Sequence, residues 1–303
     1  MSKVLSRAQP LYSADPPIIT VVEELTGVLR LAGIADPRRV ATDIIAALLE
    51  VPRSWPVMNR ESSIDSVTVS AARSAVQKLC RGAPFAYAVG TAAFRHLNLF
   101  VDERVLIPRP ETEILVGEVL ERMNARTRTD GWGTAIDIGT GSGAIALALA
   151  SEGHFDRVIA TDASVDALQV AAINLQRCAR VLQSPVELAA GSFIAPVSGL
   201  RATVIVSNPP YVAFAEMEAL PSSVRDWEPP LALFSGHDGM TATSAIVRGA
   251  ETVLASGGIL ALEVDERRAS LVSDLLMRRG AFADVGVRLD LTGRERFVFA
   301  TRI

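Results

Sequence analysis

Residues 135–146 read AIDIGTGSGAIA, which is the pattern of a short apolar strand, a glycine-rich turn and the first turn of a helix. Glycine has no Cβ, so this turn can adopt positive φ angles and let a ligand approach the backbone closely. From residue 133 onward, strand patterns alternate with helical patterns, which is typical of a parallel sheet covered by helices on both faces. We therefore predict an α/β fold for residues 107–303.

The strands and helices of this fold can be placed along the chain. The expected strands are 134–138, 157–161, 185–189, 203–207, 258–263, 281–288 and 295–301, and the expected helices are 142–152, 164–181, 239–256 and 266–279. A short turn at 291–294 separates the last two strands. Tight turns join antiparallel strands, whereas parallel strands need a long crossover. We therefore expect an antiparallel hairpin at one edge of the sheet.

The first part of the chain follows a different pattern, in which apolar residues recur at helical spacing. The segments with this spacing are 18–31, 37–49 and 66–80. We interpret residues 17–88 as a small all-helical domain. Residues 1–16 are polar and contain prolines, so we interpret them as a flexible tail.

A linker joins the two domains at residues 89–106. The alternating apolar residues Leu97, Leu99 and Val101 predict a β-hairpin within it. Pro110 then suits the first position of the helix that follows, because proline has no N–H to lose there. The hairpin linker therefore ends just before the α/β domain.

Composition narrows the function classes. The 303 residues are 49% hydrophobic and 21% charged, with a net charge of −4, as in ordinary globular proteins. Residues 1–86 carry 10 Lys/Arg and 8 Asp/Glu, whereas residues 87–303 carry 20 and 26. This acidic balance weighs against direct nucleic-acid binding. No apolar run is as long as a membrane span, and the N-terminus lacks a signal pattern. We expect a cytoplasmic protein without a membrane partner.

Residues 204–211 read VIVSNPPY, a buried strand stopped by two prolines. Pro209 and Pro210 cannot extend a sheet ladder, so they form a stiff corner past the end of the strand. Asn208 offers a side-chain acceptor beside backbone carbonyls, and Tyr211 offers an aromatic face. This arrangement suits a planar group that carries –NH2, and we predict these residues to be catalytic. The structural alternative is an ordinary turn, since Asn-Pro commonly opens one.

The glycine-rich turn predicts a cofactor site made by residues 139–143, namely Gly139, Thr140, Gly141, Ser142 and Gly143, and we expect Asn208 to contact the cofactor as well. Asp162, at the end of the next strand, is placed to accept hydrogen bonds from two ribose hydroxyls. The same glycines also satisfy the G-x-G-x-x-A pattern of dinucleotide-binding enzymes, so an NAD enzyme is the rival interpretation.

Two features favour S-adenosylmethionine over NAD as the cofactor. Asp137, just before the turn, could hold a cationic amino group, which S-adenosylmethionine has and NAD lacks. Hydride transfer also has no use for the motif at 208–211. Cys80 and Cys178 match no metal-ligand spacing, so no metal site is expected. A glycine turn that serves structure alone is the third interpretation.

Together these motifs resemble the amino-methyltransferases that carry Asn-Pro-Pro-Tyr, and more closely the release-factor glutamine methyltransferases of the HemK/PrmC family. The resemblance covers roughly residues 20–303. It rests on GAPFAY at 82–87, LIPRPETE at 106–113, DIGTGSG at 137–143, NPPY at 208–211, WEPPLAL at 227–233 and GRER at 293–296.

The resemblance implies a seven-stranded class I methyltransferase (Rossmann-like) domain, preceded by a helical N-terminal domain and a β-hairpin linker. We interpret the helical domain, residues 17–88, as a substrate-recognition module, and the alternative is that it only braces the catalytic domain. It also implies S-adenosylmethionine as the cofactor and a peptide-chain release factor as the protein partner. The methyl acceptor would be the side-chain amide of glutamine in the Gly-Gly-Gln motif. Direct transfer to this nitrogen needs no general base beforehand. This fits the sequence, which offers no plausible catalytic histidine, because His96, His154 and His237 all fall in hairpin or loop positions.

Two stretches depart from the family pattern. The third strand is followed by Gly191, Ser192 and Phe193, where the family usually has an acidic residue; Phe193 can still pack on the adenine ring. Residues 262–267 lack the glycine and glutamine usual after the fifth strand. A nucleic-acid amino-methyltransferase is one alternative, since adenine and guanine also present a planar –NH2. A non-catalytic methyltransferase-like paralogue is another.

Overall fold

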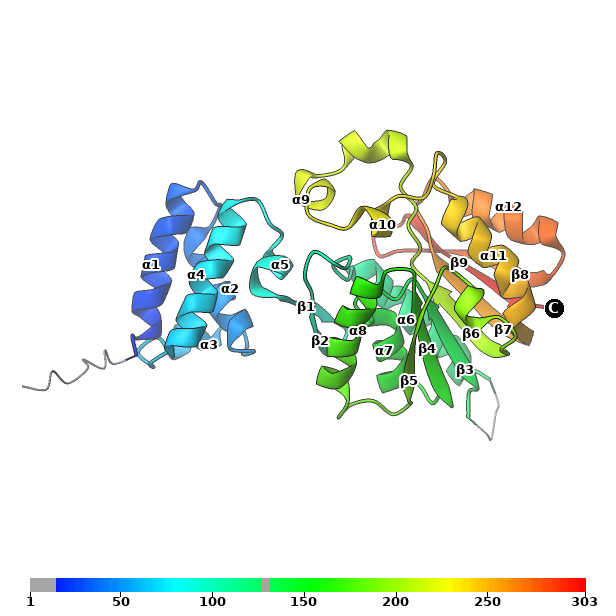
Figure 1. The fold of residues 1–303 in the computed structure, drawn as a ribbon, viewed down its shortest axis with the longest axis horizontal. Helices are drawn as coiled ribbons and strands as arrows, with labels where there is room; N and C mark the ends of the chain where they lie inside the picture. Colours follow the sequence, from blue (N-terminus) through cyan, green and yellow to red (C-terminus); the bar gives the residue numbers. More distant parts are fainter. Residues whose placement is uncertain (1–14, 127–130) are drawn as a thin grey trace, which may run out of the picture. The chain divides into compact units, whose positions relative to one another are not determined.

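A computed structural model describes residues 15–126 and 131–303, so residues 1–14 of the predicted tail lie outside the described residues. The chain divides into two compact units, with the boundary between Val89 and Gly90 (Figure 1). No helix in the described ranges is long and apolar enough to cross a membrane.

The first unit is helical. Its helices are α1 (Ile18–Leu31), α2 (Pro37–Leu48), α3 (Trp55–Met58), α4 (Ser66–Cys80) and α5 (Phe85–Val89). The long helices α1, α2 and α4 match the predicted segments, and their apolar faces meet in one core around Leu29, Ile44 and Ala72. Asp65 caps α4 by accepting a hydrogen bond from the Thr68 N–H at 2.9 Å. The two short helices, α3 and α5, were not expected.

The second unit opens with the predicted hairpin, in which β1 (Thr91–Phe94) pairs antiparallel with β2 (Leu97–Phe100). Leu97, Leu99 and Val101 are all buried, as their alternation indicated. Helix α6 (Pro110–Asn124) begins at the predicted proline.

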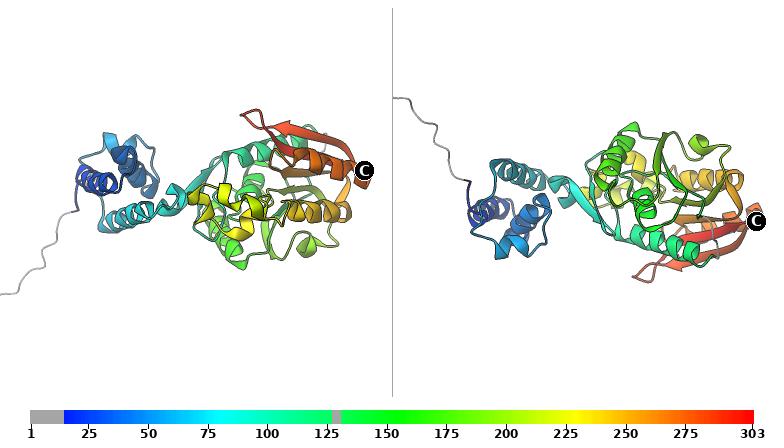
Figure 2. Two further views of the ribbon diagram at one scale, coloured as in Figure 1. Left: turned by 90° about the horizontal axis from the view of Figure 1, so that it is seen from above. Right: turned by 90° about the horizontal axis from the view of Figure 1, so that it is seen from below.

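The large sheet has seven strands within the described residues, in the order β5-β4-β3-β6-β7-β9-β8. The strands are β3 (Thr134–Ile138), β4 (Arg157–Asp162), β5 (Val186–Ala190), β6 (Ala202–Ser207), β7 (Leu254–Glu263), β8 (Phe282–Leu289) and β9 (Glu295–Arg302). Strands β3 to β7 are parallel, and β9 runs antiparallel to both β7 and β8. The predicted edge hairpin is therefore confirmed (orange-red in Figure 2).

Helices cover both faces of this sheet, and the strand residues alternate between two cores. The helices are α6, α7 (Ala144–Glu152), α8 (Val165–Cys178), α11 (Thr241–Val253) and α12 (Ala269–Arg279). Ala135 of β3 packs with α6 and α7, whereas Ile136 and Ile138 pack with α11 and α12. Burial on both faces explains why the central strands read as continuous apolar runs.

Several predicted boundaries were wrong. Helix α8 ends at Cys178 and not at residue 181, and α12 begins at Ala269 and not at residue 266. The helix expected at 239–256 ends at Val253, and β7 begins directly at Leu254 instead of at residue 258. Leu254 is buried and pairs with Ala202, and the strand register then shifts before Ile259 pairs with Val204. Tertiary pairing therefore overrides the helical pattern over 254–256.

A long excursion separates β6 from α11, and we call its residues 211–237 the flap. It contains the short helices η2 (Phe214–Ala219), α9 (Ser222–Arg225) and α10 (Pro230–Leu233). Its two ends are tied together, because Val212 N–H donates to the Leu233 carbonyl and Ser235 N–H donates to the Val212 carbonyl, each at 2.9 Å. The flap lies over the carboxyl ends of the sheet strands (yellow in Figure 1).

Candidate active site

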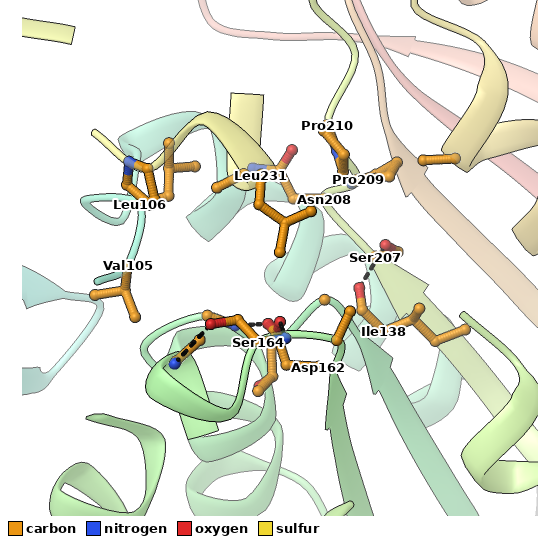
Figure 3. A pocket seen from close by; sticks show the side chains of 18 of the residues that line it. Val105, Leu106, Ile138, Asp162, Ser164, Ser207, Asn208, Pro209, Pro210 and Leu231 are labelled. Carbon is orange, nitrogen blue, oxygen red and sulfur yellow. Dashed lines mark hydrogen bonds between the residues drawn. The ribbon is translucent and has the colours of Figure 1, made fainter. Parts of the chain in front are cut away.

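A cavity of about 320 Å³ opens at the carboxyl ends of β3, β4 and β6, beneath the flap (Figure 3). Ligands of open α/β sheets bind at this edge, and the volume falls in the usual range for small-molecule sites. The cavity wall combines the glycine turn 139–142, the loop 191–193, the corner 207–210 and residues of α6 and the flap. Most of the predicted site residues therefore meet in one place.

The glycine turn contributes its first two glycines to the cavity. Gly139 and Gly141 have φ of +74° and +53°, and nothing lies within 4 Å of where a Cβ would sit. Gly143 has a different task. A Cβ there would lie 3.2 Å from Leu147 Cδ1 and 3.5 Å from Ala171 Cβ, and Gly143 does not line the cavity. It allows close helix packing, while Gly139 and Gly141 expose backbone to a ligand.

Asp162 lies at the end of β4 and lines the cavity. Its Oδ2 accepts a hydrogen bond from the Gly141 N–H at 2.9 Å, and its Oδ1 accepts one from the Ser164 N–H at 2.8 Å. Burial raises the pKa of Asp162, although these hydrogen bonds oppose the shift. Each carboxylate oxygen has more than one lone pair, so Asp162 can still accept hydrogen bonds from a ligand.

Asp137 does not lie where we expected. Its side chain is fully buried and does not line the cavity. Oδ2 accepts hydrogen bonds from the Thr140 hydroxyl at 2.6 Å and the Ala146 N–H at 3.1 Å, while Oδ1 has no partner among the described residues. Burial raises the pKa of Asp137 to about 7. In this structure Asp137 supports the turn through Thr140 and Ala146 from outside the cavity wall.

The corner after β6 brings Asn208, Pro209 and Pro210 to the cavity wall. The strand end is fixed because the Ser207 hydroxyl donates to the Ile138 carbonyl at 2.6 Å (Figure 3). Tyr211 is the member of the predicted motif that does not line the cavity. Burial raises the pKa of Tyr211 to about 12, and the nearby charge of Glu263 adds to the shift.

Asn208 is hydrogen-bonded to Thr112, which in turn is hydrogen-bonded to Glu263, and the sequence did not assign either residue to the site. Asn208 Nδ2 donates to Thr112 Oγ1 at 3.2 Å, and the Thr112 hydroxyl donates to Glu263 Oε2 at 2.6 Å. Glu263 ends β7 and is 2% exposed. Burial raises its pKa to about 7, against the opposing effects of the Thr112 hydrogen bond and the Arg296 charge. A carboxylate at the end of an otherwise apolar strand was the available signal in the sequence.

The flap is fastened over the cavity by an ion pair. Arg109 Nη2 lies 2.6 Å from Glu228 Oε1 and 2.8 Å from its Oε2. The Glu228 side chain is 1% exposed and that of Arg109 is 31% exposed. Burial raises the pKa of Glu228, and Arg109 opposes the shift. A buried carboxylate needs such a partner, so this pair fixes the flap relative to α6.

Phe193 lies at the cavity, whereas the three histidines of the sequence do not line it. Phe193 lines the cavity beside Ser192 and is 36% exposed, so its ring is available at the mouth. His96, His154 and His237 lie in turns or loops, as expected, and none lines the cavity. Within residues 15–126 and 131–303, no group of three or more His, Cys, Asp or Glu side chains could hold a metal ion.

Two family descriptions match the chain. A PrmC N-terminal domain matches residues 20–90, and a methyltransferase small domain matches residues 113–220. A release factor glutamine methyltransferase of Moorella thermoacetica is 37% identical over 274 residues, which are 90% of this chain and 94% of the relative. The one of Mycolicibacterium smegmatis is 37% identical over 288 residues, 94% and 97% of the two chains. The chain belongs to the release factor glutamine methyltransferase family.

Membership of this family decides between the two cofactor interpretations. A methyltransferase uses S-adenosylmethionine as its methyl donor, so the NAD interpretation was wrong. The cavity fits this choice, because Gly139 and Gly141 expose backbone and Asp162 offers acceptor oxygens for a ribose.

The fold of this family member also has a more distant solved counterpart. The hMettl16 catalytic domain, solved in complex with a 3′UTR hairpin, superposes with a TM-score of 0.51 at 14% identity. The match covers 81% of this chain and 85% of that one. At this identity the likeness concerns the fold alone, and it agrees with the predicted class I methyltransferase architecture.

Proposed function

We propose that this chain transfers the methyl group of S-adenosylmethionine to the side-chain amide nitrogen of the glutamine in the Gly-Gly-Gln motif of release factors. One observation carries this proposal beyond family membership. Asn208 stands at the cavity wall with its Nδ2 already engaged by Thr112, which leaves Oδ1 as an acceptor for a planar –NH2 group.

The difficulty of the reaction explains the form of the site. An amide nitrogen is a poor nucleophile because its lone pair is delocalised into the carbonyl. Asn208 Oδ1 and the Pro209 carbonyl would each accept one N–H of the substrate amide and turn its lone pair toward the methyl carbon. Holding the amide in this orientation is equivalent to a high effective concentration of the reacting nitrogen, on the order of 10⁵ M or more. The rigid proline corner keeps these acceptors in place.

The donor supplies an electrophilic methyl on a sulfonium, whose carbon–sulfur bond breaks with its electron pair going to sulfur. The nitrogen that gains the methyl then loses a proton readily, so no general base is needed before transfer. This agrees with a cavity wall on which the described residues place no histidine. Tyr211 does not line the cavity, so we assign it to supporting the corner rather than to direct stacking on the amide.

We assign the cofactor to the other half of the cavity. The backbone of residues 139–142 would face the amino acid part of the donor, Asp162 would accept its ribose hydroxyls, and Phe193 would pack on the adenine ring. Gly143 and Asp137 would act indirectly, since one packs the helix and the other holds the turn.

We assign substrate recognition to the helical unit, residues 17–88, and the hairpin at 89–106 links this unit to the α/β domain. The proposed substrate is a translation protein, so the reaction would take place in the cytoplasm. The acidic balance of residues 87–303 favours a protein acceptor over a nucleic acid.

Two measurements test the proposed function. Isothermal titration calorimetry with S-adenosylmethionine should show binding at one site. The transfer of a labelled methyl group should then be measured with release factor, ribosomal RNA and DNA as separate acceptors. Label on the release factor supports the proposal, while label on a nucleic acid, or binding without any transfer, would overturn it.

A further inference from the structure

Three side chains from different parts of the fold form a hydrogen-bond chain that ends at the cavity. Glu263 closes β7, Thr112 lies in the first turn of α6, and Asn208 follows β6. Thr112 and Glu263 are 4% and 2% exposed, so water does not compete for these contacts. Thr112 lies 96 residues from Asn208 and 151 residues from Glu263 in the sequence. The fold thus assembles a contact that no local motif contains.

The chemistry of the three groups fixes which group donates and which accepts in each hydrogen bond. An ionised carboxylate can only accept hydrogen bonds, so the Thr112 hydroxyl must give its one proton to Glu263. The Thr112 oxygen then has lone pairs and no proton left for Asn208. It can therefore receive the Nδ2–H of Asn208 but cannot serve its Oδ1. As a result, the oxygen of Asn208 is left for the cavity.

We propose that Glu263, acting through Thr112, is a positioning residue that makes Asn208 present its oxygen, and not its NH2, to the substrate nitrogen. This inference rests on the proposed function, because it specifies how the acceptor for the methylated –NH2 is set. Neither Glu263 nor Thr112 needs to touch the reacting atoms. Their contribution is to exclude the flipped amide, which would place a donor against the substrate's own donors.

The proposal has a pH dependence with a definite sign. A protonated Glu263 can donate to Thr112, which then donates to Asn208, so the preference for one amide orientation is lost. Burial raises the pKa of Glu263 to about 7, so this loss occurs as the pH falls through about 7. The charged and titratable groups that act on Glu263 are Arg109 and Glu111 near the start of α6, Tyr211 after β6, and Arg296 of β9.

Substitutions at Thr112 and Glu263 test the kinetic consequence. Thr112→Val keeps the shape but removes the hydroxyl, and we expect kcat for release-factor methylation to fall about 10- to 100-fold, as when other positioning contacts are lost. The Kd for S-adenosylmethionine should change by less than about threefold. Thr112→Ser should restore most of the rate. Glu263→Gln, which can also donate, should lower kcat and remove the acid limb of the pH–rate profile.

A second readout keeps the inference separate from the choice of substrate. In protein labelled with ¹⁵N-asparagine, the side-chain amide signals of Asn208 can be assigned by their loss in Asn208→Asp. They should shift with a midpoint near pH 7 in the wild type, and the shift should vanish in both Thr112→Val and Glu263→Gln. If release factor is not methylated, the proposed function fails, but this titration still tests whether Glu263 acts on Asn208 through Thr112. Unchanged titration in either variant, or equal rates in Thr112→Val and wild type, would overturn the inference.

Discussion

The Asp162 carboxylate accepts a hydrogen bond from the Gly141 N–H at 2.9 Å and so joins the end of β4 to the glycine turn after β3. The same carboxylate holds the Ser164 N–H at the start of α8. One side chain therefore shapes the glycine turn and, in the proposed function, would also offer acceptors to the cofactor. Its loss should affect binding through both contributions.

We predict that Asp162→Ala weakens the binding of S-adenosylmethionine by about 1.5–3 kcal/mol, because hydrogen bonds to a charged group are lost. Isothermal titration calorimetry measures this directly. Asp166→Ala is the matched control, since Asp166 is exposed on the first turn of α8 and does not line the cavity. Equal affinity in Asp162→Ala and wild type would remove Asp162 from the cofactor site.

The raised pKa of Asp137 predicts that the free energy of unfolding depends on pH. Its pKa is raised from 3.8 to about 7 in the folded protein, so the folded state holds this proton more tightly than the unfolded state. The corresponding stability is fully present below about pH 4 and is lost as the pH rises through about 7. Between pH 5 and pH 8, wild-type protein should lose on the order of 2 kcal/mol of unfolding free energy through this group.

Asp137→Asn should remove that loss, because an amide has no proton to release and can still accept from Thr140 and Ala146. Urea unfolding of the two proteins without cofactor, at pH 5 and at pH 8, measures the difference. Other shifted groups such as Glu263 are common to both proteins and cancel in the comparison. Parallel pH dependence of the two unfolding free energies would show that Asp137 is not the group responsible.

Asn208 should separate catalysis from cofactor binding. We predict that Asn208→Ala lowers the rate of methyl transfer by about 10²-fold or more, from the loss of one oriented hydrogen bond and its alignment. Affinity for S-adenosylmethionine should stay within a few-fold. Asn208→Asp should retain part of the rate, because it still accepts from the substrate but has no N–H for Thr112. A wild-type rate in Asn208→Ala, from single-turnover assays, would exclude the proposed role.

Removal of the helical unit should separate recognition from chemistry. All the described residues that line the cavity follow Gly90, so protein comprising residues 90–303 should bind S-adenosylmethionine like the full chain. It should methylate intact release factor poorly. A short peptide containing Gly-Gly-Gln serves as the control acceptor, on which both proteins should act equally slowly. Full activity of the shortened protein on release factor would show that residues 17–88 are not a docking module.

The sequence predicted the sheet and its ligand edge because these depend on local patterns. The apolar strands, the glycine turn 139–143 and the stop at Pro209 each reflect a nearby physical requirement, such as burial on both sheet faces or a positive φ. The boundary at Leu254 was missed because pairing with Ala202, a distant residue, decides it.

The environment of single side chains was the part that could not be predicted. Asp137 and Tyr211 stand in the expected motifs, yet neither is among the residues that line the cavity. Thr112 and Glu263 reach the site through contacts between α6, β6 and β7, and sequence spacing gives no information on such contacts. The sequence motifs therefore showed where the site lies, whereas the role of each residue in it depended on tertiary packing.

The position of the transferred methyl group tests the central claim most directly. Release factor should be incubated with this protein and S-adenosylmethionine carrying a deuterated methyl, then digested and analysed by tandem mass spectrometry. We predict the label on the side-chain nitrogen of the Gly-Gly-Gln glutamine, and no label on a release factor whose glutamine is replaced by alanine. Label on another residue, or on an RNA base amino group with the glutamine unmodified, would contradict the proposed function.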